Sequence, residues 1–94
     1  MEKARITVSV RPDDTFEISM NEAGREVLIR ELQVLSKRWD HIHLDCTDGW
    51  PDPHATEVVL SSIPYNEGDK VLLNGKLLFR PDDWDEKYYP HVMK

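Results

Sequence analysis

The chain of 94 residues has a formal net charge of −6, with 39% hydrophobic and 32% charged residues. This length predicts a single domain over residues 1–94 with one core, and the hydrophobic content excludes a disordered chain. The acidic balance disfavours a nucleic-acid binder, which needs clustered Lys and Arg to displace counterions from phosphates. A basic partner protein fits this charge better, and the alternative is that the acidic charge serves only to keep the chain soluble.

The single cysteine, Cys46, excludes an internal disulfide and fits a reducing compartment. No apolar run follows the first residues, so we expect neither a secretory signal nor a membrane span. Together these features predict a cytoplasmic protein.

Residues 5–10 alternate between polar and apolar side chains, as a strand with one buried face does. The Arg-Pro-Asp-Asp sequence at 11–14 supplies turn residues, and residues 15–20 resume the alternation. The pattern predicts a hairpin of two strands.

A long amphipathic helix is predicted over Ser19–Arg38, because one half of its helical wheel is apolar. Its start matches a capping box from Ser19 to Glu22, and Asn21 is an alternative N-cap. Glu31 lies within the apolar arc, where an unpaired carboxylate would be costly, so we expect it at a rim. Ile29 lies in the polar half and is a candidate exposed contact.

A third strand is predicted over residues 41–46, with His41, His43 and Asp45 on one face and apolar residues on the other. Two imidazoles and a carboxylate make a partial zinc site, with His54 or His91 as distant donors. The alternatives are a solvated row of side chains, or a face under the helix with Glu31 as hydrogen-bond partner.

Residues 47–56 form a predicted loop that contains Trp50 flanked by Asp48 and Asp52. Trp50 either folds back onto the core or binds a partner together with these two acids. Residues 57–62 read as a fourth strand. Strands at 70–73 and 76–80 flank Asn74-Gly75, which favours a type I′ hairpin. The alternative is one continuous strand with a bulge or bend at this dipeptide.

The acidic and aromatic segment 80–94 is predicted to be a short helix or an ordered tail. Pro81 suits a first helical position, Trp84 and Tyr88 are four residues apart, and Pro90 ends the helix. These aromatics either pack on the sheet or bind a partner. The candidate partner-binding residues of this segment are Asp82, Asp83, Trp84, Asp85, Tyr88 and Tyr89. Those of the predicted loop are Asp48, Trp50 and Asp52.

Motifs of enzymes are missing from the sequence, which has no glycine-rich phosphate loop, no G-x-S-x-G elbow and no H-E-x-x-H helix. Paired acids such as Asp13-Asp14 lie in predicted turns and do not enclose a substrate. We therefore expect a protein that is not an enzyme and needs no cofactor.

The residues Ile18-Ser19-Met20-Asn21-Glu22-Ala23-Gly24, continuing to Leu35, and Asp40-His41-Ile42-His43-Leu44 resemble the immunity protein 32 family of bacterial polymorphic toxin systems. The resemblance covers about the middle third of the chain and implies a small α+β domain. It also implies a cytosolic protein that binds and neutralises a cognate toxin. The loop 47–56 and the tail 80–94 lie outside the resemblance.

The fold expected is α+β, with five to six strands in one antiparallel sheet, in the order β-β-α-β-β-β, and the helix on one face. The function expected is neutralisation of a basic bacterial toxin by protein–protein binding, without nucleic acid or membrane. The alternatives are a metal- or ligand-binding domain that uses His41, His43 and Asp45, and a self-associating module whose sheet face or edge pairs with itself.

Overall fold

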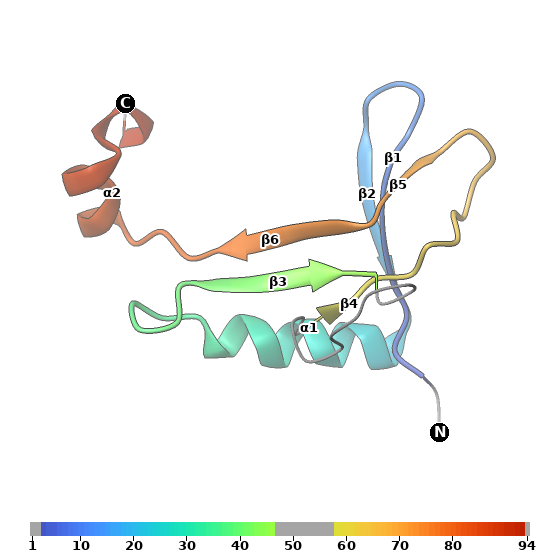
Figure 1. Ribbon diagram of the computed structural model, residues 1–94, viewed down its shortest axis with the longest axis horizontal. Coiled ribbons are helices and arrows are strands. Elements are labelled where there is room, and N and C mark those ends of the chain that lie inside the picture. Colours follow the sequence, from blue (N-terminus) through green and yellow to red (C-terminus); the bar gives the residue numbers. More distant parts are fainter. Residues whose placement is uncertain (1–2, 47–57, 94) are drawn as a thin grey trace.

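The computed structural model describes residues 3–46 and 58–93, which form an α+β fold of two small sheets and two α-helices (Figure 1). In the first sheet, β1 (Ile6–Val10) lies between β2 (Phe16–Met20) and β5 (Lys70–Leu72). In the second, β3 (His41–Asp45) lies between β4 (Val58–Val59) and β6 (Asn74–Leu78). The helices are α1 (Glu22–Val34) and α2 (Asp82–Tyr88), followed by the 3-10 helix η2 (Pro90–Met93).

The prediction of one sheet is wrong, because the chain changes sheets between β5 and β6. β5 pairs with β1 and β6 pairs with β3, so the two strands around Asn74-Gly75 do not pair with each other. Both residues belong to β6, and the positive φ angles of the described residues occur only at Asp14 and Gly68. The predicted type I′ hairpin is therefore wrong. The structure agrees better with the alternative of a bend, but the interruption between the two strands falls at Leu73 and not at Asn74-Gly75.

The prediction of a wholly antiparallel arrangement is also wrong, because β3 and β4 are parallel, with Leu44 opposite Val58. Parallel neighbours need a crossover of about a dozen residues or more, and residues 46–57 supply that length. A periodicity in sequence marks a strand but does not give its direction relative to a neighbour.

Helix α1 is shorter at both ends than the sequence predicts. Ser19 belongs to β2 and pairs with Thr7, so the helix begins after Asn21, the alternative N-cap. At the other end the Ser36 hydroxyl accepts hydrogen bonds from the amides of Arg38 and Trp39, both at 3.2 Å, which closes a turn after the helix. The strand alternation and this turn override the helical periodicity.

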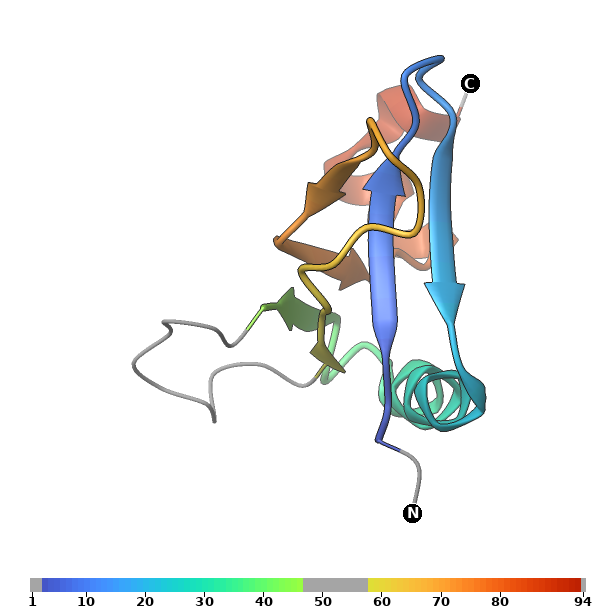
Figure 2. The ribbon, with the colours of Figure 1, turned by 90° about the vertical axis from the view of Figure 1, so that its right-hand side faces the viewer.

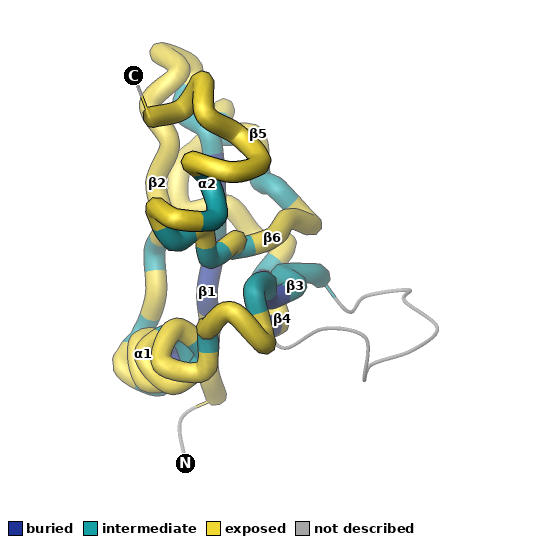
Figure 3. Tube along the Cα trace, turned by 90° about the vertical axis from the view of Figure 1, so that its left-hand side faces the viewer, coloured by how far each residue is buried: buried dark blue, intermediate teal, exposed yellow. Residues whose placement is uncertain are grey.

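The core lies where α1 meets both sheets. Among the described residues, its buried apolar side chains are Ile6, Ile42, Val58 and Leu60, and α1 contributes Val27 and Leu28 at their border. Figures 2 and 3 show α1 below the first sheet, and Figure 3 shows buried segments in β1 and β3. No helix within residues 3–46 and 58–93 is long and apolar enough to cross a membrane.

The first turn of α1 approaches the backbone of β1 closely. A Cβ atom on the buried Gly24 would lie 2.6 Å from the carbonyl oxygen of Arg5 and 2.9 Å from Cγ1 of Ile6. The Asn21 side-chain oxygen accepts from the amides of Arg5 (3.0 Å) and Gly24 (2.8 Å). Its side-chain amide donates to the carbonyl of Lys3 at 2.8 Å. One side chain therefore caps the helix and holds the chain that leads into β1.

Replacing Gly24 with Ala should destabilise the protein. The new methyl group would force a backbone carbonyl to move, and this cost outweighs the about 1 kcal/mol that Ala gains over Gly in a helix. We expect a net loss of about 1 to 2 kcal/mol in the free energy of unfolding, measured by urea denaturation. Gly75→Ala is the matched control, because a Cβ there meets nothing within 4 Å. Equal losses for both variants would contradict the role of this close approach.

An ion pair joins the β1–β2 turn to the turn before β5. Nη1 of Arg11 lies 2.8 Å from Oδ1 of Asp69, whose side chain is only 1% exposed. Asp69 also accepts a hydrogen bond of 3.2 Å from the Asn66 side chain. A buried carboxylate needs such partners, so this pair fixes the two turns to each other.

Arg11→Met should therefore cost about 2 kcal/mol of unfolding free energy, because it leaves the Asp69 charge buried with a single weak donor. The control is Arg25→Met, which removes an exposed pair with Glu26 and should cost about 0.5 kcal/mol or less. Thermal or urea unfolding of both variants measures the difference. A loss for Arg11→Met no larger than for Arg25→Met would show that burial of the pair is unimportant.

Candidate partner-binding site

The C-terminal segment forms the short helix that the sequence predicts. Pro81 is the N-cap and not the first helical residue that the sequence predicts, so the helix begins at Asp82. The Pro81 carbonyl accepts hydrogen bonds from the amides of Trp84 (3.0 Å) and Asp85 (3.1 Å). Three aspartates occupy the first turn, where carboxylates complement the positive end of a helix. The rings of Trp84 and Tyr88 lie 5.4 Å apart, as their spacing of four residues predicts.

Helix α2 lies at the opposite end of the molecule from β1 and β2 (Figure 1). It packs mainly on η2. An ion pair of 2.5 Å between Lys37 and Asp83 connects α2 to the turn after α1. This hydrogen bond to Lys37 is the main reason that the pKa of Asp83 lies below its ordinary value of 3.8. Since both side chains are well exposed, the pair positions the helix more than it stabilises it.

Aromatic side chains and charges are interleaved on the surface of this segment. Tyr88 is 56% exposed and Tyr89 is 41% exposed. The guanidinium of Arg80 lies 5.6 Å from the centre of the Tyr89 ring, and the Lys87 ammonium lies 5.2 Å from that of Tyr88. Asp85 contributes a carboxylate oxygen that is shielded from solvent and accepts no hydrogen bond from a described residue.

Next to this segment, the start of β3 carries a row of rings on the face of the second sheet that points away from α1. Trp39 stacks on His41, with ring centres 6.5 Å apart and an interplanar angle of 6°. His41 meets His43 edge to face at 4.9 Å. The predicted common face of the two histidines is thus correct, and the alternative that places them under the helix beside Glu31 is wrong, because Ile42 is the residue that points into the core.

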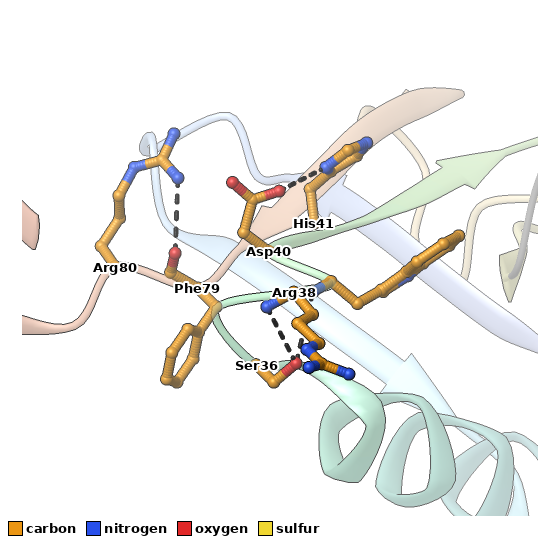
Figure 4. A network of polar contacts seen from close by, with 7 residues as sticks. Ser36, Arg38, Asp40, His41, Phe79 and Arg80 are labelled. Carbon is orange, nitrogen blue, oxygen red and sulfur yellow. Dashed lines mark hydrogen bonds and ion pairs between the residues drawn. The ribbon is translucent and has the colours of Figure 1, made fainter.

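The His41 ring is fixed by its neighbour in the chain. Nδ1 of His41 lies 2.8 Å from Oδ1 of Asp40, and this contact is the largest cause that lowers the pKa of Asp40 (Figure 4). The amide of Phe79 donates to the Asp40 carbonyl at 2.7 Å, which ties the end of β6 to the same point. Within the described ranges, no three His, Cys, Asp or Glu residues gather as a metal site.

The sequence-predicted candidates fall into two groups. Those of the tail, namely Asp82, Asp83, Trp84, Asp85, Tyr88 and Tyr89, come together on α2 and its end. Those of the loop, namely Asp48, Trp50 and Asp52, lie outside the described residues. Glu31 is half-buried and Ile29 is exposed, as expected. Two shallow hollows lined by residues within 3–5 and 59–65 contain none of the tail residues.

The sequence reasoning missed Trp39 and Arg80 as parts of this surface. Trp39 lies beyond the end of α1 and is 51% exposed. Its spacing of two from His41, and of four from His43, continues the strand alternation one step earlier, and this signal was available in the sequence. Arg80 had no sequence signal, since its position over Tyr89 depends on the path of the chain after β6.

Comparison with known proteins yields no match to a family model, to a curated protein or to a solved structure.

The ion pair of Lys37 predicts a pH dependence at Asp83. A lowered folded pKa contributes stability above the ordinary Asp value, and this contribution is lost as the pH falls through the lowered value. We expect the Asp83 carboxyl to titrate below 3.8 in an NMR titration and to shift upward in Lys37→Gln. Lys87→Gln, which changes an ammonium on α2 itself, is the control. An unchanged Asp83 titration in Lys37→Gln would exclude the pair in solution.

Proposed function

We propose that this chain is a non-enzymatic binding protein that neutralises a basic bacterial toxin through the surface formed by α2, its flanking residues and Trp39, here called the α2 surface. The observation that carries the proposal is the combination of exposed aromatic rings and clustered acids on a segment that packs little against the rest of the fold. The resemblance of residues 18–44 to an immunity protein family supports the choice of partner.

The chemistry of the α2 surface suits a cationic protein partner. Acidic side chains accelerate the encounter with a basic surface, and aromatic anchors slow its dissociation. Trp and Tyr are enriched among the residues that dominate binding energy.

The first alternative, a metal- or ligand-binding domain built on His41, His43 and Asp45, is not favoured by the geometry. The two imidazoles meet edge to face, and the described residues bring no third ligand to them. His41 is instead held by Asp40 and stacked on Trp39. These contacts suit a rigid aromatic platform at the border of the α2 surface.

Growth rescue tests the proposal. The reading frame adjacent to this gene is expressed in a sensitive host, with and without the chain. We expect the chain to relieve toxicity and the double variant Asp82→Lys/Glu86→Lys to lose most of this protection, because it reverses charge on α2 and keeps the Lys37–Asp83 pair. Tyr88→Ala should have a similar effect.

The matched control is Glu26→Lys/Glu67→Lys, which changes net charge equally on exposed positions away from α2. It should protect as well as the natural chain does. A binding measurement with the purified pair, with the expected loss of about tenfold or more in affinity for each α2 variant, separates weak binding from poor expression. Protection that survives both α2 variants, or a harmless neighbour, would contradict the proposal.

A further inference from the structure

We propose that β2 pairs with β2 of a second copy of this chain, so that two first sheets join across a two-fold axis. The proposal rests on the edge of the first sheet and is independent of the proposed function. β2 is an outer strand of this sheet, and Phe16 is 69% exposed and Ile18 48% exposed. Such an edge is a template for pairing with another strand.

The hydrogen bonds that flank the β1–β2 ladder show which backbone groups reach the edge. The amide of Arg11 donates to the carbonyl of Thr15 at 2.7 Å. At the other end, the amide of Asn21 donates to the carbonyl of Arg5 at 3.1 Å. Bonded and non-bonded pairs alternate along an antiparallel ladder. Counted inward from both ends, the bonded pairs of the register are Thr7 with Ser19 and Ser9 with Glu17.

The remaining residues of β2, Phe16, Ile18 and Met20, form the non-bonded pairs with β1. Their backbone N–H and C=O groups therefore point to the open edge, away from β1. The same three residues carry the apolar side chains of the strand, and all three are exposed. The edge thus combines unpaired backbone groups with an apolar row, within the part of the chain that the structure describes.

A two-fold axis at Ile18 satisfies these groups together. In this register Ile18 lies opposite Ile18 of the second copy, and Phe16 lies opposite the second copy's Met20. Each opposed pair exchanges both of its backbone hydrogen bonds. Phe16 and Met20 would form a contact between sulfur and an aromatic ring, which is favourable. The symmetry makes every contact occur twice, as in an isologous dimer.

The charges fit the same register. Glu17 lies opposite Ser19 of the second copy, on the polar face, so the two glutamates are not directly opposed. Like charges directly opposite each other would be destabilising, and a register centred on Glu17 would place them so. The strand is therefore complementary to itself in the register that also pairs the apolar residues.

The other described edges are less suited to this pairing. β4 has two residues and β5 has three, and β5 begins with Lys70. β6 has five residues but includes Lys76 and Gly75. Short length and lysines are devices that prevent association at sheet edges, and β2 has neither. A single five-residue pairing buries less than the about 1,600 Å² of a standard interface, so we expect a dimer that dissociates on dilution.

Sedimentation of the full chain from about 1 μM to 500 μM tests the proposal, since weak interfaces have dissociation constants in the micromolar range. We expect a monomer–dimer equilibrium for the natural chain. Ile18→Lys should shift it at least about tenfold toward monomer, because the two introduced lysines would lie directly opposite each other across the two-fold axis and repel. Ile29→Lys, the same change on an exposed residue of α1, should leave the equilibrium unchanged.

A second measurement fixes the register even if Ile18→Lys folds poorly. In a Cys46→Ser background, Ile18→Cys places two thiols opposite each other, with Cα atoms about 5.5 Å apart, within the range of a disulfide. Glu17→Cys places them diagonally, about 7–8 Å apart, which is too far. Mild oxidation should cross-link the first variant and not the second. A natural chain that stays monomeric throughout, or Glu17→Cys cross-linking as well as Ile18→Cys, would overturn the proposal.

Discussion

The contact on which the fold depends is the close approach between the first turn of α1 and the strand β1. Gly24 leaves room for the Arg5 carbonyl, and the Asn21 side chain bonds to both segments. Because Asn21 follows β2 directly, this junction sets the direction in which α1 leaves the first sheet. The helix then runs along the second sheet, where Val27 and Leu28 border the core. A shift at Asn21 would therefore be transmitted to both sheets.

This junction gives structural roles to residues of the stretch 18–24, which was compared with an immunity protein family from the sequence. Asn21 caps α1, and Gly24 allows its close contact with β1. In the second stretch Ile42 and Leu44 belong to or border the core, whereas His41 and His43 lie on the opposite face. Residues that the fold requires say little about a partner. The surface residues of α2, which lie outside the resemblance, have to be tested directly.

Local patterns predicted the elements well and their assembly poorly. The alternation at Ile6, the alternative N-cap at Asn21 and the spacing of Trp84 and Tyr88 all describe neighbours along the chain, and the structure confirms them, although the capping box at Ser19 does not form. The separation into two sheets depends on which strand β5 and β6 each meet. That choice is made by the distant strands β1 and β3, so Asn74-Gly75 could not reveal it. The candidate site has the same limit, because the contact between Arg80 and the Tyr89 ring depends on the path of the chain after β6, which local patterns do not give.

Alternation also shows that a strand has an apolar face, but not that this face is covered. In β1 the apolar row begins with the buried Ile6, whereas the matching row of β2 is exposed from Phe16 to Met20. Pairing of two β2 strands would extend the apolar face across two copies. It would also leave α2 free, because β2 and α2 lie at opposite ends of the molecule (Figure 1). A dimer would thus present two α2 surfaces, and a partner with repeated basic sites would bind it with an avidity well above that of one surface. In that arrangement the β2 edge would strengthen the proposed binding through α2 without contacting the partner.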